Sequence, residues 1–143
     1  LVLECYEAFS APAREKKIKF SVELPDNTLV AESVDSERMK QVIAILLDNA
    51  ISYTPEGGTV VLKSSETVKS YCIEVADSGI GIDDAAKKRI FDRFYRADES
   101  RTSKSHFGLG LSIAKEIVEL HHGTILVSDT KGGGATFRIT LPK

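Results

Sequence analysis

The stretch VADSGIGIDD, residues 75–84, places an acid directly behind an apolar run and leaves two of the next four positions without side chains. Residues 71–77 have the composition of a strand, so Asp77 falls at the carboxyl end of that strand. A carboxylate there can accept hydrogen bonds at a pocket floor, while Gly79 and Gly81 let a ligand approach the backbone. Taken alone, these residues favour a plain turn, with Asp as turn former and Gly supplying positive φ.

The composition indicates one compact globular domain: 143 residues, 42% hydrophobic and 28% charged, with a net charge of −2. No run of like charge suggests nucleic acid or an anionic membrane surface as a partner. No apolar stretch approaches the ~18 residues that span a bilayer, and the first residues do not resemble a signal peptide. Cys5 and Cys72 lack metal-ligand spacing, which favours reduced thiols in the cytoplasm.

Periodicity along the chain predicts strands alternating with helices. Strands are predicted at 18–24, 59–65, 71–77, 124–129 and 135–143, and helices at 35–54, 83–95 and 110–122. Strands joined by short turns should be antiparallel, and the helices should stack on one face. The expected fold is therefore an α/β (α+β) two-layer sandwich with a mixed, largely antiparallel sheet. Residues 97–107 lack periodicity and are predicted to form a mobile surface loop.

Asn49 lies at the margin of the apolar face of the predicted helix 35–54, in one row with Ile45 and Tyr53. A buried amide without partners costs about 1–3 kcal/mol, so backbone, water, a ligand or a metal must bond to it. The helix alone leaves a core asparagine and a ligand-binding asparagine equally open.

A second glycine pair, Gly108 and Gly110, enters the predicted helix 110–122, where free backbone N–H groups can cradle a phosphate. Basic residues lie on or next to the neighbouring loop and could neutralise a polyphosphate: Arg93, Arg96, Arg101 and Lys104. The alternative for the glycine pair is a lid hinge, and the basic residues taken singly favour a solvated surface. The Rossmann and P-loop patterns both fail, because the third glycine of one and the lysine of the other are missing.

Taken together and in this order, the motifs resemble the catalytic, ATP-binding domain of bacterial sensor histidine kinases, within the HATPase (GHKL, Bergerat) family that includes gyrase B and Hsp90. LLDNAISYTPEGG (46–58) is similar to the N box and DSGIGI (77–82) to the G1 box. IFDRFYRAD (90–98) is similar to the F box, GLGLSIAKEIVELHHG (108–123) to the G2 box, and GGGATFRITLP (132–142) to the last hairpin. The resemblance implies a Bergerat fold with a mobile ATP lid.

The resemblance assigns roles to individual residues. Asp77 would accept a hydrogen bond from the adenine amino group, and Asn49 would coordinate Mg²⁺. The other residues that would surround the adenine are Gly81, Tyr53, Ile90 and Thr136. The residues that would contact phosphates or form the lid are Arg96, Lys104, Gly108, Leu109, Gly110 and Leu111.

Two positions depart from the family pattern. Ile45 stands where an acid or amide often lies one turn before the metal-binding Asn, and Ser52 stands where many members have Lys. Ile45 argues against a conformational ATPase, which needs an acid there to activate water. It also leaves open a degenerate module that interacts with partners without nucleotide. A serine kinase acting on a partner protein is disfavoured by the F box.

The resemblance also implies what this chain lacks. None of His106, His121 and His122 has the context of a phosphoacceptor histidine, so that residue should belong to a separate dimerisation domain. We therefore expect residues 1–17 to be a remnant of the linker from that domain and residues 18–143 to be the catalytic domain. The expected partners are ATP, Mg²⁺, the protein's own dimerisation domain and, through the full-length kinase, a response regulator. The expected setting is the cytoplasmic part of a membrane-anchored sensor.

Overall fold

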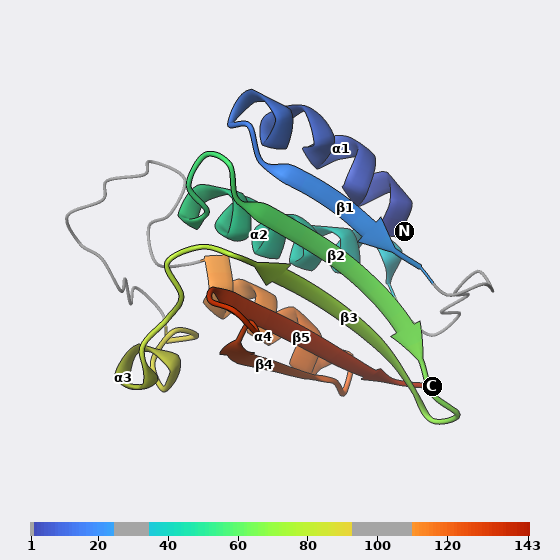
Figure 1. The fold of residues 1–143 in the computed structure, drawn as a ribbon. Helices are drawn as coiled ribbons and strands as arrows, with labels where there is room; N and C mark the ends of the chain where they lie inside the picture. The colour runs from blue at the N-terminus through green and yellow to red at the C-terminus, as the bar shows by residue number, and fades with distance from the viewer. Residues whose placement is uncertain (1, 25–34, 93–109) are drawn as a thin grey trace.

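Five strands and four helices make up the parts of the computed structural model that are described, residues 2–24, 35–92 and 110–143 (Figure 1). In chain order the elements are α1 (Val2–Glu15), β1 (Lys19–Glu23), α2 (Ser36–Tyr53), β2 (Thr59–Glu66), β3 (Ser70–Asp77), α3 (Asp84–Lys87), α4 (Gly110–Leu120), β4 (Thr124–Asp129) and β5 (Ala135–Pro142). None of these helices is long and apolar enough to cross a membrane.

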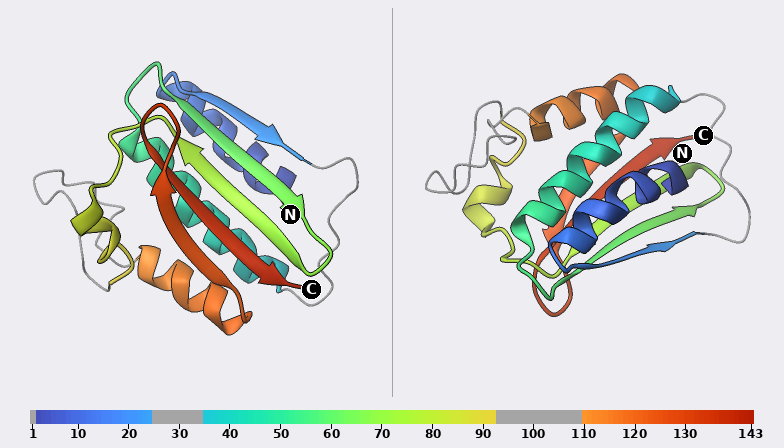
Figure 2. Two further views of the ribbon diagram at one scale, coloured as in Figure 1. Left: turned by 60° about the horizontal axis from the view of Figure 1, so that its bottom comes forward. Right: turned by 90° about the horizontal axis from the view of Figure 1, so that it is seen from above.

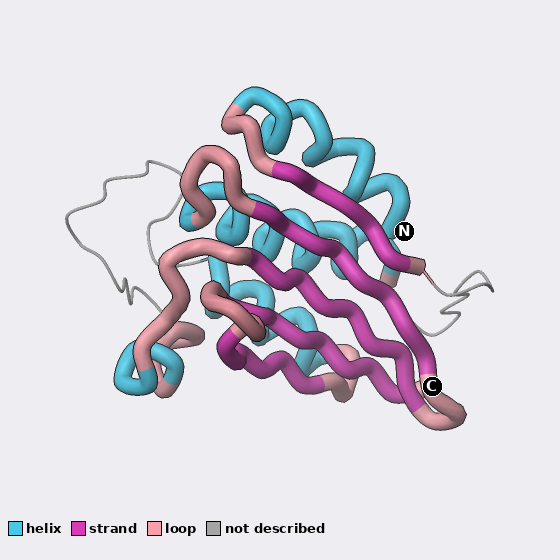
Figure 3. The backbone as a smooth tube through the Cα atoms, viewed as in Figure 1, coloured by secondary structure: helices cyan, strands magenta, loops and turns pink. Residues whose placement is uncertain are grey.

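The strands form one mixed sheet in the order β1-β2-β3-β5-β4 (Figure 3). β1 and β2 are parallel, because α2 carries the chain back between them. The pairs β2–β3, β3–β5 and β4–β5 are antiparallel. The predicted fold class is confirmed, with α1, α2 and α4 on one face of the sheet (Figure 2). The predicted lid falls outside the described residues.

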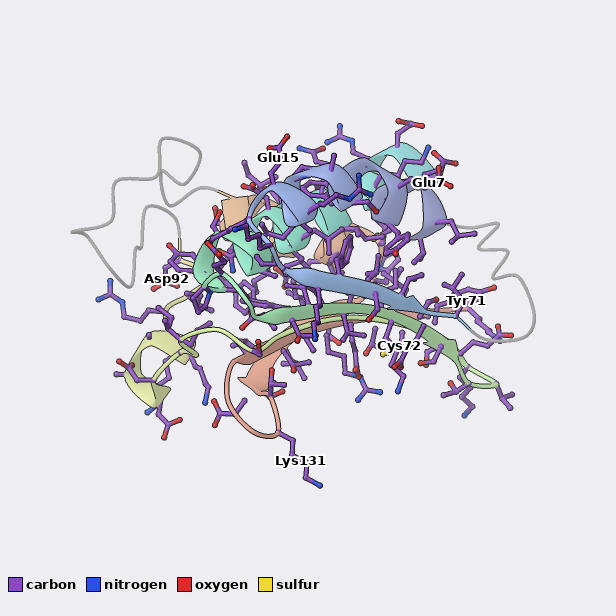
Figure 4. All side chains as sticks on the ribbon, turned by 45° about the horizontal axis from the view of Figure 1, so that its top comes forward. Glu7, Glu15, Tyr71, Cys72, Asp92 and Lys131 are labelled. Atoms are coloured by element: carbon purple, nitrogen blue, oxygen red, sulfur yellow. The ribbon has the colours of Figure 1, made fainter. Side chains whose placement is uncertain are left out.

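The core lies between the sheet and these helices. α2 contributes its largest share, since Met39, Val42, Ile43, Leu46 and Leu47 are all fully buried at the predicted three- and four-residue spacing. Alternate residues of β5 face this layer, and their neighbours face the opposite side of the sheet. Cys72 marks that opposite side in Figure 4, where no helix of the described ranges covers the sheet.

The helix predicted at 83–95 is wrong in length. α3 begins after Asp83, whose carboxylate caps the helix by accepting from the Ala86 amide, but it ends at Lys87. Ala86 is the only buried residue between 83 and 92, so no apolar stripe holds further helical turns against the core. Phe91 instead lies edge-on to Phe137, with 6.0 Å between ring centroids. Residues 93–95 lie outside the described part of the chain.

α1 packs into the core, although Pro12 lies within it, and buries Val2, Cys5 and Ala13. Its end is a Schellman motif: the Lys17 amide bonds to the Arg14 carbonyl at 3.0 Å, and the Ile18 amide to the Ala13 carbonyl at 2.9 Å. Lys17 therefore adopts a left-handed conformation with φ of 61°, at a position where glycine is the usual residue. The assignment of residues 1–17 to a linker stays a prediction.

Lys17→Gly should raise the free energy of unfolding by about 1 kcal/mol, because glycine adopts positive φ without the steric cost of a Cβ. The lost ion pair with Glu56 joins two largely exposed side chains and adds little. Denaturant unfolding measures the change, and Lys17→Ala is the control, since it removes the same charge and keeps the Cβ. Equal stabilities of the two variants would contradict the explanation.

Candidate functional site

Three elements bring their ends together at one end of the molecule: the carboxyl ends of β3 and α2 and the amino end of α4 (Figure 1). The hairpin between β4 and β5 lies at the same end. The predicted site residues that are described come from these ends and from the chain that follows β3.

Asp77 is the last residue of β3 and is buried, with 5% of its surface exposed. Its Oδ1 accepts two backbone hydrogen bonds, from the Gly79 amide at 2.9 Å and from the Ala135 amide at 3.1 Å. Its other oxygen, Oδ2, accepts no hydrogen bond from a described residue. One side of the carboxylate is thus fixed by the protein, and the other is available to a ligand that donates a hydrogen bond.

Glycines make the surroundings of Asp77 possible. A Cβ at Gly79 would collide with the Tyr53 carbonyl oxygen, and one at Gly134 with the Asp77 carbonyl oxygen. Gly81 and Gly134 also have positive φ, at 75° and 108°. The two glycines predicted beside the acid therefore have different roles. Gly79 allows close contact with the Tyr53 carbonyl, and Gly81 adopts a left-handed backbone conformation.

Burial raises the pKa of Asp77, and the hydrogen bonds from Ala135 and Gly79 oppose that rise. Between the ordinary value of 3.8 and the raised pKa, the folded protein holds more protons at this group than the unfolded chain. The contribution of Asp77 to stability is therefore present at low pH and is lost as the pH rises through this window.

Asp77→Asn should keep both backbone hydrogen bonds through the amide oxygen while removing the buried charge. The melting temperature of the variant minus that of the wild type should therefore increase as the pH rises from about 4 to 7. Thermal unfolding at several pH values measures this difference. The control is Asp92→Asn, which makes the same substitution at an exposed carboxylate, paired with Arg89, outside the site. A flat difference for Asp77→Asn would contradict the pKa assignment.

The carboxyl end of α2 is held by donors from three places. The carbonyls of residues 51–53 have no partner in the helix's own ladder of backbone hydrogen bonds, because the helix ends at Tyr53. The Lys16 ammonium donates to the first two of them (2.7 and 2.9 Å) and the Ile80 amide to the third (3.4 Å), while the Thr54 hydroxyl donates to the Ala50 carbonyl one residue earlier (2.7 Å). The Ile80 bond joins this helix end to the chain just after Asp77.

One side of α2 carries Ile45, Asn49 and Tyr53, and it runs from the start of α4 at Gly110 to the chain after β3 at Gly79. At one end, Ile45 lies against the start of α4. A Cβ added at Gly110 would come within 3.4 Å of the Ile45 Cγ2 atom. At the other end, the Tyr53 carbonyl contacts the chain at 79 and 80. Asn49 lies between them, half-buried, and its amide makes no hydrogen bond within the described part of the chain.

Because Asn49 is half-buried, its amide is open to water, to a ligand or to a cation, and no described residue of a neighbouring loop bonds it. The described residues hold no group of three His, Cys, Asp or Glu side chains that could bind a metal. A hard cation at Asn49 would therefore take its remaining ligands from water or from a bound anion, as Mg²⁺ often does.

The other predicted residues are placed as follows. Gly110 is the first residue of α4, and the side chain of Leu111 packs against the core. Ile90 is half-buried in the turns after α3. Arg96, Lys104, Gly108 and Leu109 lie outside the described residues, so the predicted phosphate contacts at these positions stay predictions.

Thr136 is not brought to Asp77. It pairs with Ala76, one residue before the acid, and so faces the other side of the sheet, where its hydroxyl lies 2.9 Å from that of Thr130. Ala135 takes its place beside the carboxylate, through its backbone amide. The alternation of buried residues along the last strand was the signal that separates these two neighbours, since Ala135 shares its face with Phe137.

A groove on the outer side of α4 is separate from this site. Its lining residues are Phe91, Asp92, Ser112, Lys115, Glu116, Glu119 and Leu120. None of them contacts Asp77, and the groove shares no residue with the row along α2.

Residues 34–143 match the family model of the histidine kinase-, DNA gyrase B- and HSP90-like ATPases, with the site at the ends of β3, α2 and α4 inside the match. The chain belongs to this family. One relative is the sensor histidine kinase TmoS of Ectopseudomonas mendocina, 46% identical over 136 residues, which cover 94% of this chain and 14% of TmoS. The chain thus spans about a seventh of that relative.

Solved structures of the same family have the same fold. The catalytic domain of the histidine kinase ThkA superposes with a TM-score of 0.87 at 32% identity, over 99% of this chain and 90% of that domain. Full-length ShkA in complex with AMPPNP gives a TM-score of 0.81 at 29% identity, over 99% of this chain and 29% of ShkA. The predicted resemblance to histidine kinase catalytic domains is confirmed.

Proposed function

We propose that this domain binds Mg·ATP and presents the γ-phosphate for transfer to a histidine on the dimerisation domain of its own kinase, in two-component signalling. The observation that carries the proposal is the buried carboxylate of Asp77, with Oδ1 held by two amides and Oδ2 left for a ligand. The family match and the likeness to a kinase bound to an ATP analogue support it.

At the adenine end, Asp77 Oδ2 would accept a hydrogen bond from the exocyclic amino group of the base. Gly79 lets the chain after β3 pack against the Tyr53 carbonyl, and Gly81 adopts the positive φ of this segment, so both glycines shape the backbone that would border the ring. Tyr53, at the end of α2, would border the same ring. The acid would select adenine over guanine, because guanine has a carbonyl oxygen in place of that amino group and would leave two acceptors facing each other.

At the phosphate end, the amino end of α4 offers free N–H groups at Gly110 and Leu111. Asn49, between the two ends, would hold Mg²⁺, which neutralises phosphate charge when it is bound. The other residues proposed to contact the phosphates or to form the lid at this end are Arg96, Lys104, Gly108 and Leu109. Phosphoryl transfer needs positioning and charge neutralisation more than covalent help, which agrees with a site that offers amides and an Asn rather than a nucleophile.

The remaining proposals concern the longer protein. We infer that the acceptor histidine lies on a separate dimerisation domain, that a response regulator takes the phosphoryl group from it, and that this domain works in the cytoplasm. A conformational ATPase of the same family is the second candidate. Ile45 argues against that candidate, since it offers no group to activate water next to Asn49. Slow hydrolysis by this domain would agree with either function.

Asp77→Asn should weaken binding of a non-hydrolysable ATP analogue about 10- to 100-fold, because a hydrogen bond to a charged acceptor contributes about 1.5–3 kcal/mol. Calorimetric titration in the presence of Mg²⁺ measures the dissociation constant, and Asp92→Asn is the matched control. Wild-type affinity in a folded Asp77→Asn variant would overturn the site. No binding by the folded wild type would favour a nucleotide-independent interaction module.

Asn49→Ala should abolish the gain in affinity that Mg²⁺ brings, while binding of the analogue without metal stays close to wild type. The reason is that the variant removes one metal ligand and no contact to the base. The same titration with Mg²⁺ and with a chelator gives both values. Gln41→Ala removes an exposed amide from the same helix and should leave the magnesium effect intact. An unchanged magnesium effect in Asn49→Ala would exclude the proposed metal ligand.

A further inference from the structure

Lys16 completes the carboxyl end of α2 from outside that helix. Its ammonium group donates to the carbonyl oxygens of Ile51 and Ser52, at 2.7 and 2.9 Å. α2 has no basic residue in its own last turn, so this is a cation brought from 35 residues away to the negative end of the helix dipole. Charge-assisted bonds of this kind are stronger than those between neutral groups.

α1 determines the position of the Lys16 ammonium group. Lys16 directly follows that helix, and its amide bonds to the Pro12 carbonyl at 3.2 Å. The two residues after it are tied back to the last turn by the Schellman motif. Because Val2, Cys5 and Ala13 are part of the core, the end of α1 is a fixed point from which Lys16 reaches α2.

The carbonyls bonded by Lys16 directly precede the one that contacts the site. The Tyr53 carbonyl oxygen accepts from the Ile80 amide, and Gly79 lies so close to it that a Cβ would collide. Gly79 in turn donates its own amide to Asp77 Oδ1. A short chain of contacts therefore joins the Lys16 ammonium, the last turn of α2 and the carboxylate.

We propose that Lys16 is a positioning residue for the adenine end of the nucleotide pocket, an inference that rests on the proposed function. By holding the last turn of α2, it keeps Tyr53 and the residues 79–81 in place for the base. It does so without touching the ligand. The position of α1 is thereby coupled to the affinity for nucleotide, since a shift of that helix moves the ammonium away from the two carbonyls.

The test compares Lys16→Met with Lys17→Met. Both variants remove one positive charge at neighbouring positions, but Lys17 is 75% exposed and pairs with the exposed Glu56. Lys16→Met should weaken binding of ADP without metal and of a non-hydrolysable ATP analogue with Mg²⁺ by the same factor, about 3- to 10-fold. Its preference for ADP over GDP should fall as well. Lys17→Met should bind like the wild type, and Lys16→Arg should regain much of the affinity.

A second readout needs no nucleotide. Hydrogen exchange at the Ile80 amide, measured by NMR on the free protein, should be faster in Lys16→Met than in Lys17→Met. Should Lys16→Met fail to fold, Lys16→Gln, with one neutral donor, takes its place in both experiments.

The outcomes separate the two proposals. Wild-type affinity and wild-type exchange in the Lys16 variant would overturn the positioning role and leave the nucleotide site standing. A loss confined to the ATP analogue would also overturn it, because it would indicate a direct action of the charge on the phosphates. Absence of nucleotide binding by the wild type would overturn the proposed function itself.

Discussion

The hydrogen bonds to Asp77 Oδ1 are the interaction on which the candidate site depends. One comes from Gly79, two residues onward, and the other from Ala135, at the start of β5. A buried carboxylate is costly unless hydrogen bonds compensate for lost hydration, so these two donors make the acid tolerable at that depth. They also join the loop after β3 to the first residue of β5. The same atom thus fixes the acid, the loop and the hairpin relative to one another.

Most of the secondary structure could be predicted from local sequence patterns. The spacing of apolar residues gave α2 to within a residue or two of its limits, and the structure shows Asp35 as its N-cap, with the side chain accepting from the Arg38 amide. Strand composition and short apolar runs between turn residues gave β2 to β5 nearly to the residue. Each of these signals is a property of a short window, since helix and strand periods are repeated within it.

The predictions failed where the position of a residue depends on the register of its strand or on contacts with distant segments. Thr136 and Ala135 are neighbours in β5 and therefore face opposite sides of the sheet. The register with β3 decides which of the two lies beside Asp77. α3 was expected to be longer because its residues tolerate helix, yet they have little core to pack against. The contact between Lys16 and the end of α2 could not be predicted from either segment. A lysine after a helix is common, and so is a helix without a basic residue in its last turn.

Among the described residues, the helices α1, α2 and α4 cover one face of the sheet, and none of them covers the other face (Figure 4). On that side the side chains include Cys72, Glu74 and Arg138, in which the Arg138 guanidinium bonds to both of the others. About half of the strand positions therefore contribute little to the core. Such a sheet can accept many changes on its open side without loss of folding, so the domain can diverge in surface character while the residues that hold the site stay the same.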